Sequence, residues 1–222
     1  MKKVREKGFD WMKGCACIAV ILIHYCFPNN LGTAVKTACR FAVPVFFIVS
    51  GYFMLSGEEN VCVRVKTIKK IKHISLILLP SGIFYFFVDI IRNLVTKWGG
   101  LSYHEYIENT INKWSILKFF ITNSPFRYAH LWFLLALIYC YVLMLLFDKT
   151  YPKKLVNCFP LFMFLFLVFG LWSGRLHLRN SIYGKIYVKD FFALRALPFF
   201  LAGMWLKKNR QIVMNWKISE KN

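Results

Sequence analysis

The chain has 222 residues, of which 58% are hydrophobic and only 18% charged, and its formal net charge at pH 7 is +20. Soluble globular proteins carry about 25% charged residues, and the 23 Phe, 11 Tyr and 7 Trp of this chain exceed what a core of its size would enclose. The composition therefore disfavours a soluble protein and favours a membrane protein whose exterior faces lipid. The 7 cysteines contain no C-x-x-C pair, so we expect neither a metal site nor a redox pair.

Six apolar segments approach the length of roughly 17–25 residues at which a helix crosses a bilayer. In chain order they are 12–27, 37–55, 73–91, 130–147, 159–172 and 190–206. We therefore predict an all-α, polytopic helical membrane bundle with about six transmembrane helices, in a single domain over 1–222. In this prediction 92–129 forms an extracytoplasmic loop and 207–222 a cytoplasmic tail.

The basic residues indicate how this bundle is oriented. With a cytoplasmic N-terminus, the segments on the cytoplasmic side hold 18 Lys and Arg, and those on the outer side hold 10, as the positive-inside rule expects. The first segment has a basic start but no small-residue cleavage site, so we expect an uncleaved helix. We place the chain in the inner or plasma membrane as a multi-pass protein. The net charge then reflects topology and anionic lipid headgroups, and no nucleic-acid partner is expected.

Two ionisable residues of the first segment share one helical face. Lys13 and His24 are eleven residues apart, so at about 100° per residue they return to nearly the same face, roughly 16 Å apart along the axis. An ionisable side chain inside a span is costly and indicates function, and a neutral imidazole is the cheapest general base to keep there. From the residues alone, Lys13 could equally be a snorkelling interfacial lysine and His24 a helix–helix hydrogen-bonding group.

Three other segments carry candidate binding residues. Arg40 opens the second segment and needs an anion, a carbonyl or a lipid headgroup as its partner, while Ser50 could simply allow close helix packing. Lys69 and Lys72, in a basic run at the inner end of the third segment, could bind phosphate groups or only anchor the helix. Trp132 enters the fourth segment from outside, where an interfacial aromatic belt is the ordinary explanation.

Several sequence blocks stand in a recognisable order. They are FDWMKGCACIAVILIHYCFP, then RFAVPVFFIVSGYFML with V-P-x-F-F-x-x-S-G at 43–51, a basic loop leading to LILLP, HLWFLLALIYCYVL with W-F-L at 132–134, and finally LPFFLAGMWLKKN. Together they resemble acyltransferase family 3, bacterial integral-membrane O-acyltransferases that modify cell-surface glycans. The resemblance covers nearly the whole chain.

This resemblance implies roles on the donor side of a reaction. In the family, a basic residue is followed after ten positions by a histidine regarded as catalytic, which here are Lys13 and His24. A second family feature is a pair of basic residues three apart at the inner start of helix 3, which Lys69 and Lys72 match, although arginine is more usual. The implied donor is acetyl-CoA or another acyl-CoA from the cytoplasm, whose phosphates Lys13, Lys69 and Lys72 would bind. No tightly bound cofactor is expected.

The resemblance also implies an acceptor on the outer side. Arg40, Ser50 and Trp132 would line the cavity there, and the acceptor would be a hydroxyl of a surface polysaccharide or of its lipid-linked precursor. The expected function is therefore a membrane O-acyltransferase of the bacterial cell envelope that transfers an acyl group, by resemblance acetyl.

Length leaves alternatives open, because family members usually have about ten spans and this chain has about six. The chain could be a non-catalytic membrane transport or binding module, or an inactive truncated fragment, or half of a split protein that needs a partner subunit. A related membrane domain also precedes the racemase module of some vancomycin-resistance serine racemases. Such a domain need not acylate glycans.

Overall fold

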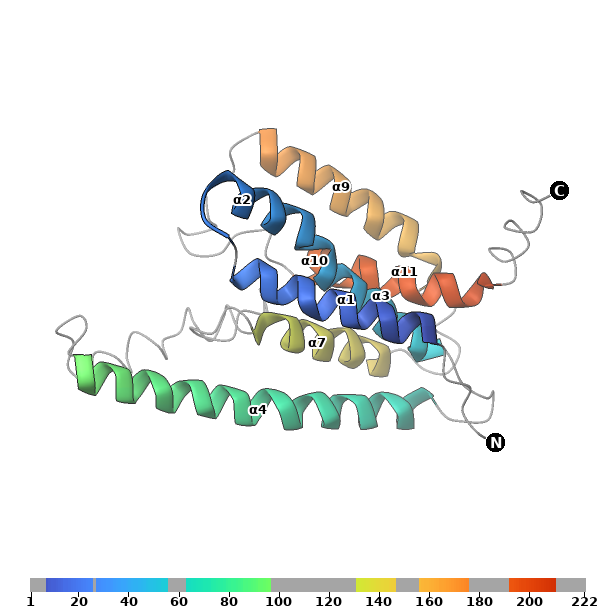
Figure 1. The fold of residues 1–222 in the computed structure, drawn as a ribbon. Coiled ribbons are helices and arrows are strands. Elements are labelled where there is room, and N and C mark those ends of the chain that lie inside the picture. The colour runs from blue at the N-terminus through green and yellow to red at the C-terminus, as the bar shows by residue number, and fades with distance from the viewer. Residues whose placement is uncertain are drawn as a thin grey trace. The chain divides into compact units, whose positions relative to one another are not determined.

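The computed structural model describes residues 7–25, 27–55, 63–96, 131–146, 156–175 and 192–210. Within these ranges the regular structure is helical and no strand occurs, which confirms the all-α class. The elements, in chain order, are α1(Lys7–His24), α2(Asn29–Ala38), η1(Cys39–Phe41), α3(Ala42–Leu55), α4(Val63–Thr96), α7(Trp132–Leu146), α9(Phe159–Arg175), α10(Phe192–Arg195) and α11(Leu197–Lys208) (Figure 1). Most of the expected loop at 92–129 and of the tail at 207–222 lies outside the described residues.

Each of the six apolar segments contains helix. Two stretches, Asn29–Leu55 and Arg64–Arg92, are long and apolar enough to cross a membrane. Two further apolar helices, Trp132–Leu146 and Phe159–Phe169, are shorter. The number of spans and the cytoplasmic N-terminus stay predictions.

The chain divides into two compact units. Unit 1 comprises Met1–Glu59, Leu155–Phe159 and Phe199–Asn222, and unit 2 comprises Asn60–Lys154 and Pro160–Pro198. Each unit is described by itself below.

Unit 1 is built around an antiparallel pair formed by α1 and the run from α2 to α3 (Figure 1). Its core is a cluster of small side chains, namely Ala16, Ala19, Cys39 and Ala42. Small residues at a helix interface let the two backbones approach closely. At the other end of the pair, the Phe9 and Tyr52 rings lie 4.5 Å apart between centroids. The start of α1 therefore lies beside the end of α3.

A glycine on each helix brings α3 and α11 together within unit 1. A Cβ atom added to Gly51 would overlap the Phe200 carbonyl oxygen, and one added to Gly203 would overlap the Ile48 carbonyl oxygen. Only glycine leaves room for backbone to meet backbone in this way. Gly51, in the S-G of the second sequence block, and Gly203, in the A-G of the last block, therefore belong to the same contact between two helices.

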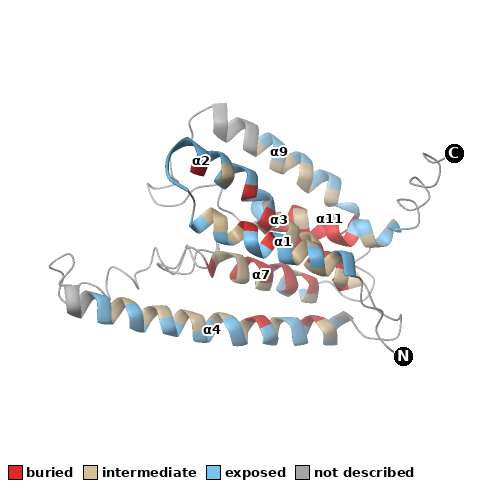
Figure 2. Cartoon of the chain, viewed as in Figure 1, coloured by how far each residue is buried: buried red, intermediate tan, exposed pale blue. Residues whose placement is uncertain are grey.

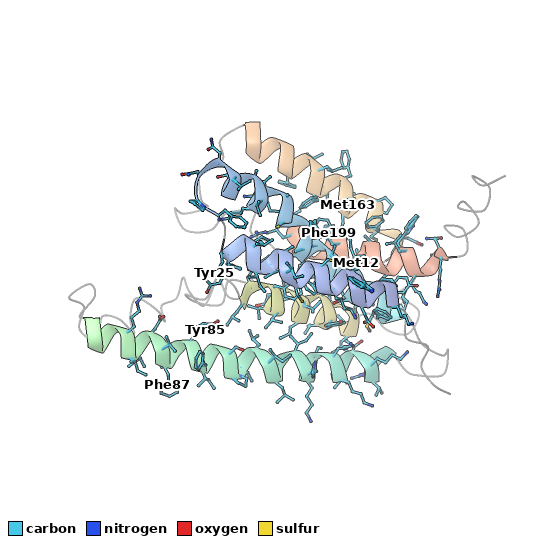
Figure 3. All side chains as sticks on the ribbon, in the orientation of Figure 1. Met12, Tyr25, Tyr85, Phe87, Met163 and Phe199 are labelled. Carbon is cyan, nitrogen blue, oxygen red and sulfur yellow. The ribbon has the colours of Figure 1, made fainter. Side chains whose placement is uncertain are left out.

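Unit 2 contains the 34-residue helix α4, which packs along α7. The helix continues through Pro80, although proline cannot donate a backbone hydrogen bond within a helix. Only 6% of the apolar stretch of α4 is buried, whereas much of α7 is buried (Figure 2). Tyr85 and Phe87 leave α4 on opposite sides (Figure 3), and Phe87 is among its exposed apolar residues. Such a surface suits contact with lipid, as expected of a transmembrane helix.

Candidate functional site

Helix α1 carries the candidate base and the candidate cation that goes with it. Ala16 and Ala19 are buried against the rest of unit 1, whereas Lys13 is half-buried and His24 is exposed. Because eleven residues turn an ideal helix by about three full turns plus 20°, Lys13 and His24 lie on one flank of α1, beside its packed face. The expected shared face of Lys13 and His24 is thus compatible with the way the helix packs.

His24 is the last residue of α1, whereas the sequence places it three residues before the end of the first span. The Tyr25 N–H still donates to the Ile21 carbonyl oxygen at 2.8 Å, so the helical bonding continues one residue further. The chain then turns back through Asn29, whose φ of 64° is left-handed. The imidazole therefore lies at the end of the helix, next to the turn that leads into α2.

The turn after His24 is held tightly against α2. A Cβ at Gly32 would overlap the Phe27 carbonyl oxygen, so glycine is required for the turn to fold back on α2 at this point. This close contact restrains the backbone that follows the imidazole. The helix end and the tight turn together define the position of His24.

Among the described residues of unit 1, the ammonium of Lys13 has two neighbours. Its Nζ lies 3.9 Å from Asp10 Oδ1 and 5.2 Å from the centre of the Phe53 ring. A cation above an aromatic face is attracted by the electron-rich ring. Lys13 is therefore held at the contact between α1 and α3, which the sequence spacing alone did not predict.

Arg40 and Ser50 occupy different parts of the second apolar segment. Arg40 lies in the 3-10 turn η1 and is exposed, while Ser50 lies in α3 and is half-buried. Ser50 precedes Gly51, whose backbone meets α11. This contact supports the close-packing interpretation for the S-G pair.

Lys69 and Lys72 are exposed residues of α4 in unit 2. Three residues on a helix correspond to about 300°, so the two side chains leave the same side. They are available to a common ligand. Lys13, His24, Arg40 and Ser50 belong to unit 1, and Trp132 belongs with the two lysines to unit 2.

Trp132 has a partner that was not among the expected site residues. The guanidinium carbon of Arg195, in α10, lies 4.5 Å from the centre of the Trp132 ring. The sequence signal was present, because Arg195 is the one charged residue in the apolar stretch FFALRALPFF, and such residues in spans are usually functional. The pair joins the W-F-L block to the start of the last apolar segment.

A family model described as an acyltransferase domain, of the acyltransferase 3 type, matches residues 6–220. The chain belongs to acyltransferase family 3. Members of this family are membrane proteins, which agrees with the long apolar helices. The match confirms the family resemblance of the sequence blocks, and it extends over both units.

One curated relative is an amino-acid racemase from Enterococcus faecalis. It is 28% identical over 200 residues, which cover 83% of this chain and 26% of the racemase. The chain therefore spans about a quarter of the length of this relative. No solved structure matches the chain.

Proposed function

We propose that the chain is a multi-pass O-acyltransferase of a bacterial cell membrane. It transfers an acyl group, acetyl in the simplest case, from cytoplasmic acyl-CoA to a hydroxyl of a cell-surface glycan or of its lipid-linked precursor. The observation that carries this proposal is the family match over 6–220, together with Lys13 and His24 on one flank of α1.

His24 is the proposed general base. It accepts the proton of the acceptor hydroxyl as the oxygen attacks the thioester carbonyl, so the O–acyl bond forms and the C–S bond breaks. The proton then passes to the departing thiolate, which leaves as the CoA thiol. His24 is exposed at the end of α1. Its imidazole is therefore accessible to an acceptor, whereas a histidine in the core would not be.

The proposed donor residues are Lys13, Lys69 and Lys72. Ammonium groups form charge-assisted hydrogen bonds with phosphate oxygens, and these are stronger than bonds between neutral groups. The exposed pair on α4 fits a ligand that approaches from outside the helix bundle. Acyl-CoA, with several phosphate groups, is such a ligand.

The proposed acceptor residues are Arg40, Ser50 and Trp132. We add Arg195 to this group because its guanidinium lies over the Trp132 ring. A guanidinium stacked on an aromatic face keeps its N–H donors in its own plane, which suits a ligand with hydroxyl or anionic oxygens.

Transfer of label tests the proposed reaction. Proteoliposomes that contain the full chain receive acetyl-labelled acetyl-CoA and isolated cell-surface glycan, and the label on the glycan is counted. We expect His24→Ala to lower the transfer rate by roughly 10²–10⁴-fold, the usual contribution of a general base. His177→Ala removes a histidine that has no proposed role and is the matched control. Transfer at the wild-type rate by His24→Ala would refute the catalytic role.

The racemase relative favours a second candidate function, a membrane module that binds or transports a small substrate without covalent chemistry. The relative's name points to an amino acid as that substrate. Uptake of labelled amino acid by the same proteoliposomes, with no label moving from acetyl-CoA to glycan, would support this alternative. Transfer of label to glycan would exclude it.

A further inference from the structure

Three aromatic rings cluster in unit 1 where the start of α1 meets the end of α3. The Phe9 ring lies 4.5 Å from Tyr52 and 5.1 Å from Phe53, and the Tyr52 and Phe53 rings lie 5.4 Å apart, all between centroids. Two of these contacts are edge-to-face, which is a favourable arrangement for aromatic pairs. The cluster packs the start of α1 against the end of α3 at this end of unit 1.

Two ammonium groups lie over this cluster, from two different helices. Lys13 Nζ of α1 is 5.2 Å from the centre of the Phe53 ring, and Lys207 Nζ of α11 is 4.9 Å from the centre of the Tyr52 ring. Because Tyr52 and Phe53 are themselves in contact, the two cations lie over neighbouring rings. Like charges so placed repel each other unless an anion lies near them.

The backbone contact between α3 and α11 determines where Lys207 lies. Gly203 meets α3 at Ile48 and Tyr52, and Lys207 follows it by four residues. Residues four apart lie on the same side of a helix, so Lys207 also faces α3. The position of its ammonium therefore follows from close helix packing, and a flexible surface lysine would lack this restraint.

Among the described residues, Asp10 is the one acidic residue that pairs with either ammonium group. Asp10 lies near Lys13 at 3.9 Å, and within the part of the chain that the structure describes no carboxylate pairs with Lys207. The next residue, Lys208, is engaged separately, because its Nζ donates to Asn157 Oδ1 at 3.1 Å. Lys7 and Arg210 are exposed and add further positive charge to the same helix ends.

We propose that Lys13 and Lys207, held over Phe53 and Tyr52, form one phosphate-binding site on unit 1. An ammonium has three N–H donors, and the donors that point away from the ring reach an anion. Because there are two ammonium groups over adjacent rings, each can donate to a different phosphate oxygen of one ligand. The source of the phosphate is either the nucleotide part of a soluble acyl donor or an anionic lipid headgroup. In its donor form this inference rests on the proposed function, but the binding itself requires no acyl transfer.

Binding by the full chain in lipid nanodiscs tests the site in two arms. The first arm uses discs of phosphatidylcholine and measures the affinity for labelled 3′,5′-ADP. The second arm adds spin-labelled phosphatidylglycerol and measures the fraction of this lipid that the protein immobilises. The variants are Lys207→Gln, Lys207→Arg and the control Lys36→Gln, which removes an exposed charge in the last turn of α2.

We expect Lys207→Gln to lower binding roughly tenfold or more in one of the two arms, since a charge-assisted hydrogen bond is lost. Lys207→Arg and Lys36→Gln should bind like the wild type. A loss in the first arm identifies a soluble nucleotide ligand, and a loss in the second identifies a lipid headgroup. Lys207→Met, which keeps the apolar stem over Tyr52, replaces Lys207→Gln if that variant does not fold.

Wild-type binding by Lys207→Gln and Lys207→Met in both arms would overturn the proposal, because the lysine would then only cover the ring. The proposed function fails in a different way. If Lys207→Gln lowers the binding of 3′,5′-ADP while wild-type protein transfers no acyl group, the phosphate site stands and the acyltransferase proposal falls.

Discussion

The contact between Arg195 and Trp132 shows what one residue pair adds to a sequence pattern. Taken alone, Trp132 suited an interfacial belt, and Arg195 was only a charge within an apolar segment. With the guanidinium carbon 4.5 Å from the ring centre, each residue accounts for the other. The arginine gains an aromatic partner for its planar face, and the tryptophan ring is oriented by it.

A double-mutant cycle measures this contact. Trp132→Leu and Arg195→Gln, singly and together, should show a coupling energy of about 0.5–1 kcal/mol in the stability of the purified protein, the usual size of an exposed cation–π pair. The cycle is needed because each residue also has other neighbours. Trp132→Leu combined with Lys69→Gln is the control pair and should be additive within about 0.5 kcal/mol. Additivity in the first pair would show that the contact contributes nothing.

At the scale of elements, two glycines decide how α3 and α11 pack. Gly51 and Gly203 look alike in the sequence to Gly14, which also lies within a helix. The structure separates them, because a Cβ at Gly14 would meet nothing within 4 Å, while one at Gly51 or Gly203 would overlap a backbone carbonyl of the facing helix. Backbone atoms cannot move aside as a flexible side chain can.

Alanine substitutions should therefore have opposite signs. We expect Gly51→Ala and Gly203→Ala each to destabilise the protein by about 1–3 kcal/mol, the usual cost of overpacking. Gly14→Ala should stabilise it by about 0.5–1 kcal/mol, because glycine is a poor helix former. Thermal unfolding in detergent compares the three variants, and a Gly51→Ala variant as stable as Gly14→Ala would contradict the packing.

Helix α4 illustrates how far an element can be predicted from hydropathy. The apolar segment at 73–91 was expected to be a span, whereas the helix runs from Val63 to Thr96. Lysine and arginine are good helix formers, so the basic residues before 73 extend the helix without extending the apolar segment. Hydropathy indicates which part of the helix is apolar enough to contact lipid, whereas helix propensity determines where the helix begins and ends.

At the scale of the whole molecule, the distribution of basic residues predicts an orientation that fusions can test. Green fluorescent protein fused after Lys208 should fluoresce in the cytoplasm, and alkaline phosphatase inserted at 110 should be active outside it. The physical reason is the excess of Lys and Arg on the side assigned to the cytoplasm. A fusion after Lys208 that does not fluoresce, together with an inactive phosphatase at 110, would contradict the six-span topology.

The family match also belongs to this scale, because it extends over residues of both units. The blocks recognised in the sequence come from both units as well. Two of them, the S-G block and the final block, meet in unit 1 at Gly51 and Gly203. Their order along the chain was visible in the sequence, but their contact required the fold.

The sequence by itself determined the all-helical class, the apolar segments, the family, and the alignment of Lys13 with His24 along α1. The helical class, the apolar segments and the alignment of the two residues follow from composition and helical periodicity, and the family follows from the order of the sequence blocks; all of these are properties of the chain read along its length. Only the tertiary structure decided that Lys207 lies over Tyr52, that Arg195 lies over Trp132, and that two glycines bring α3 and α11 together. Such contacts join residues far apart in the sequence, and they depend on the crossing and register of packed helices, which no local pattern encodes.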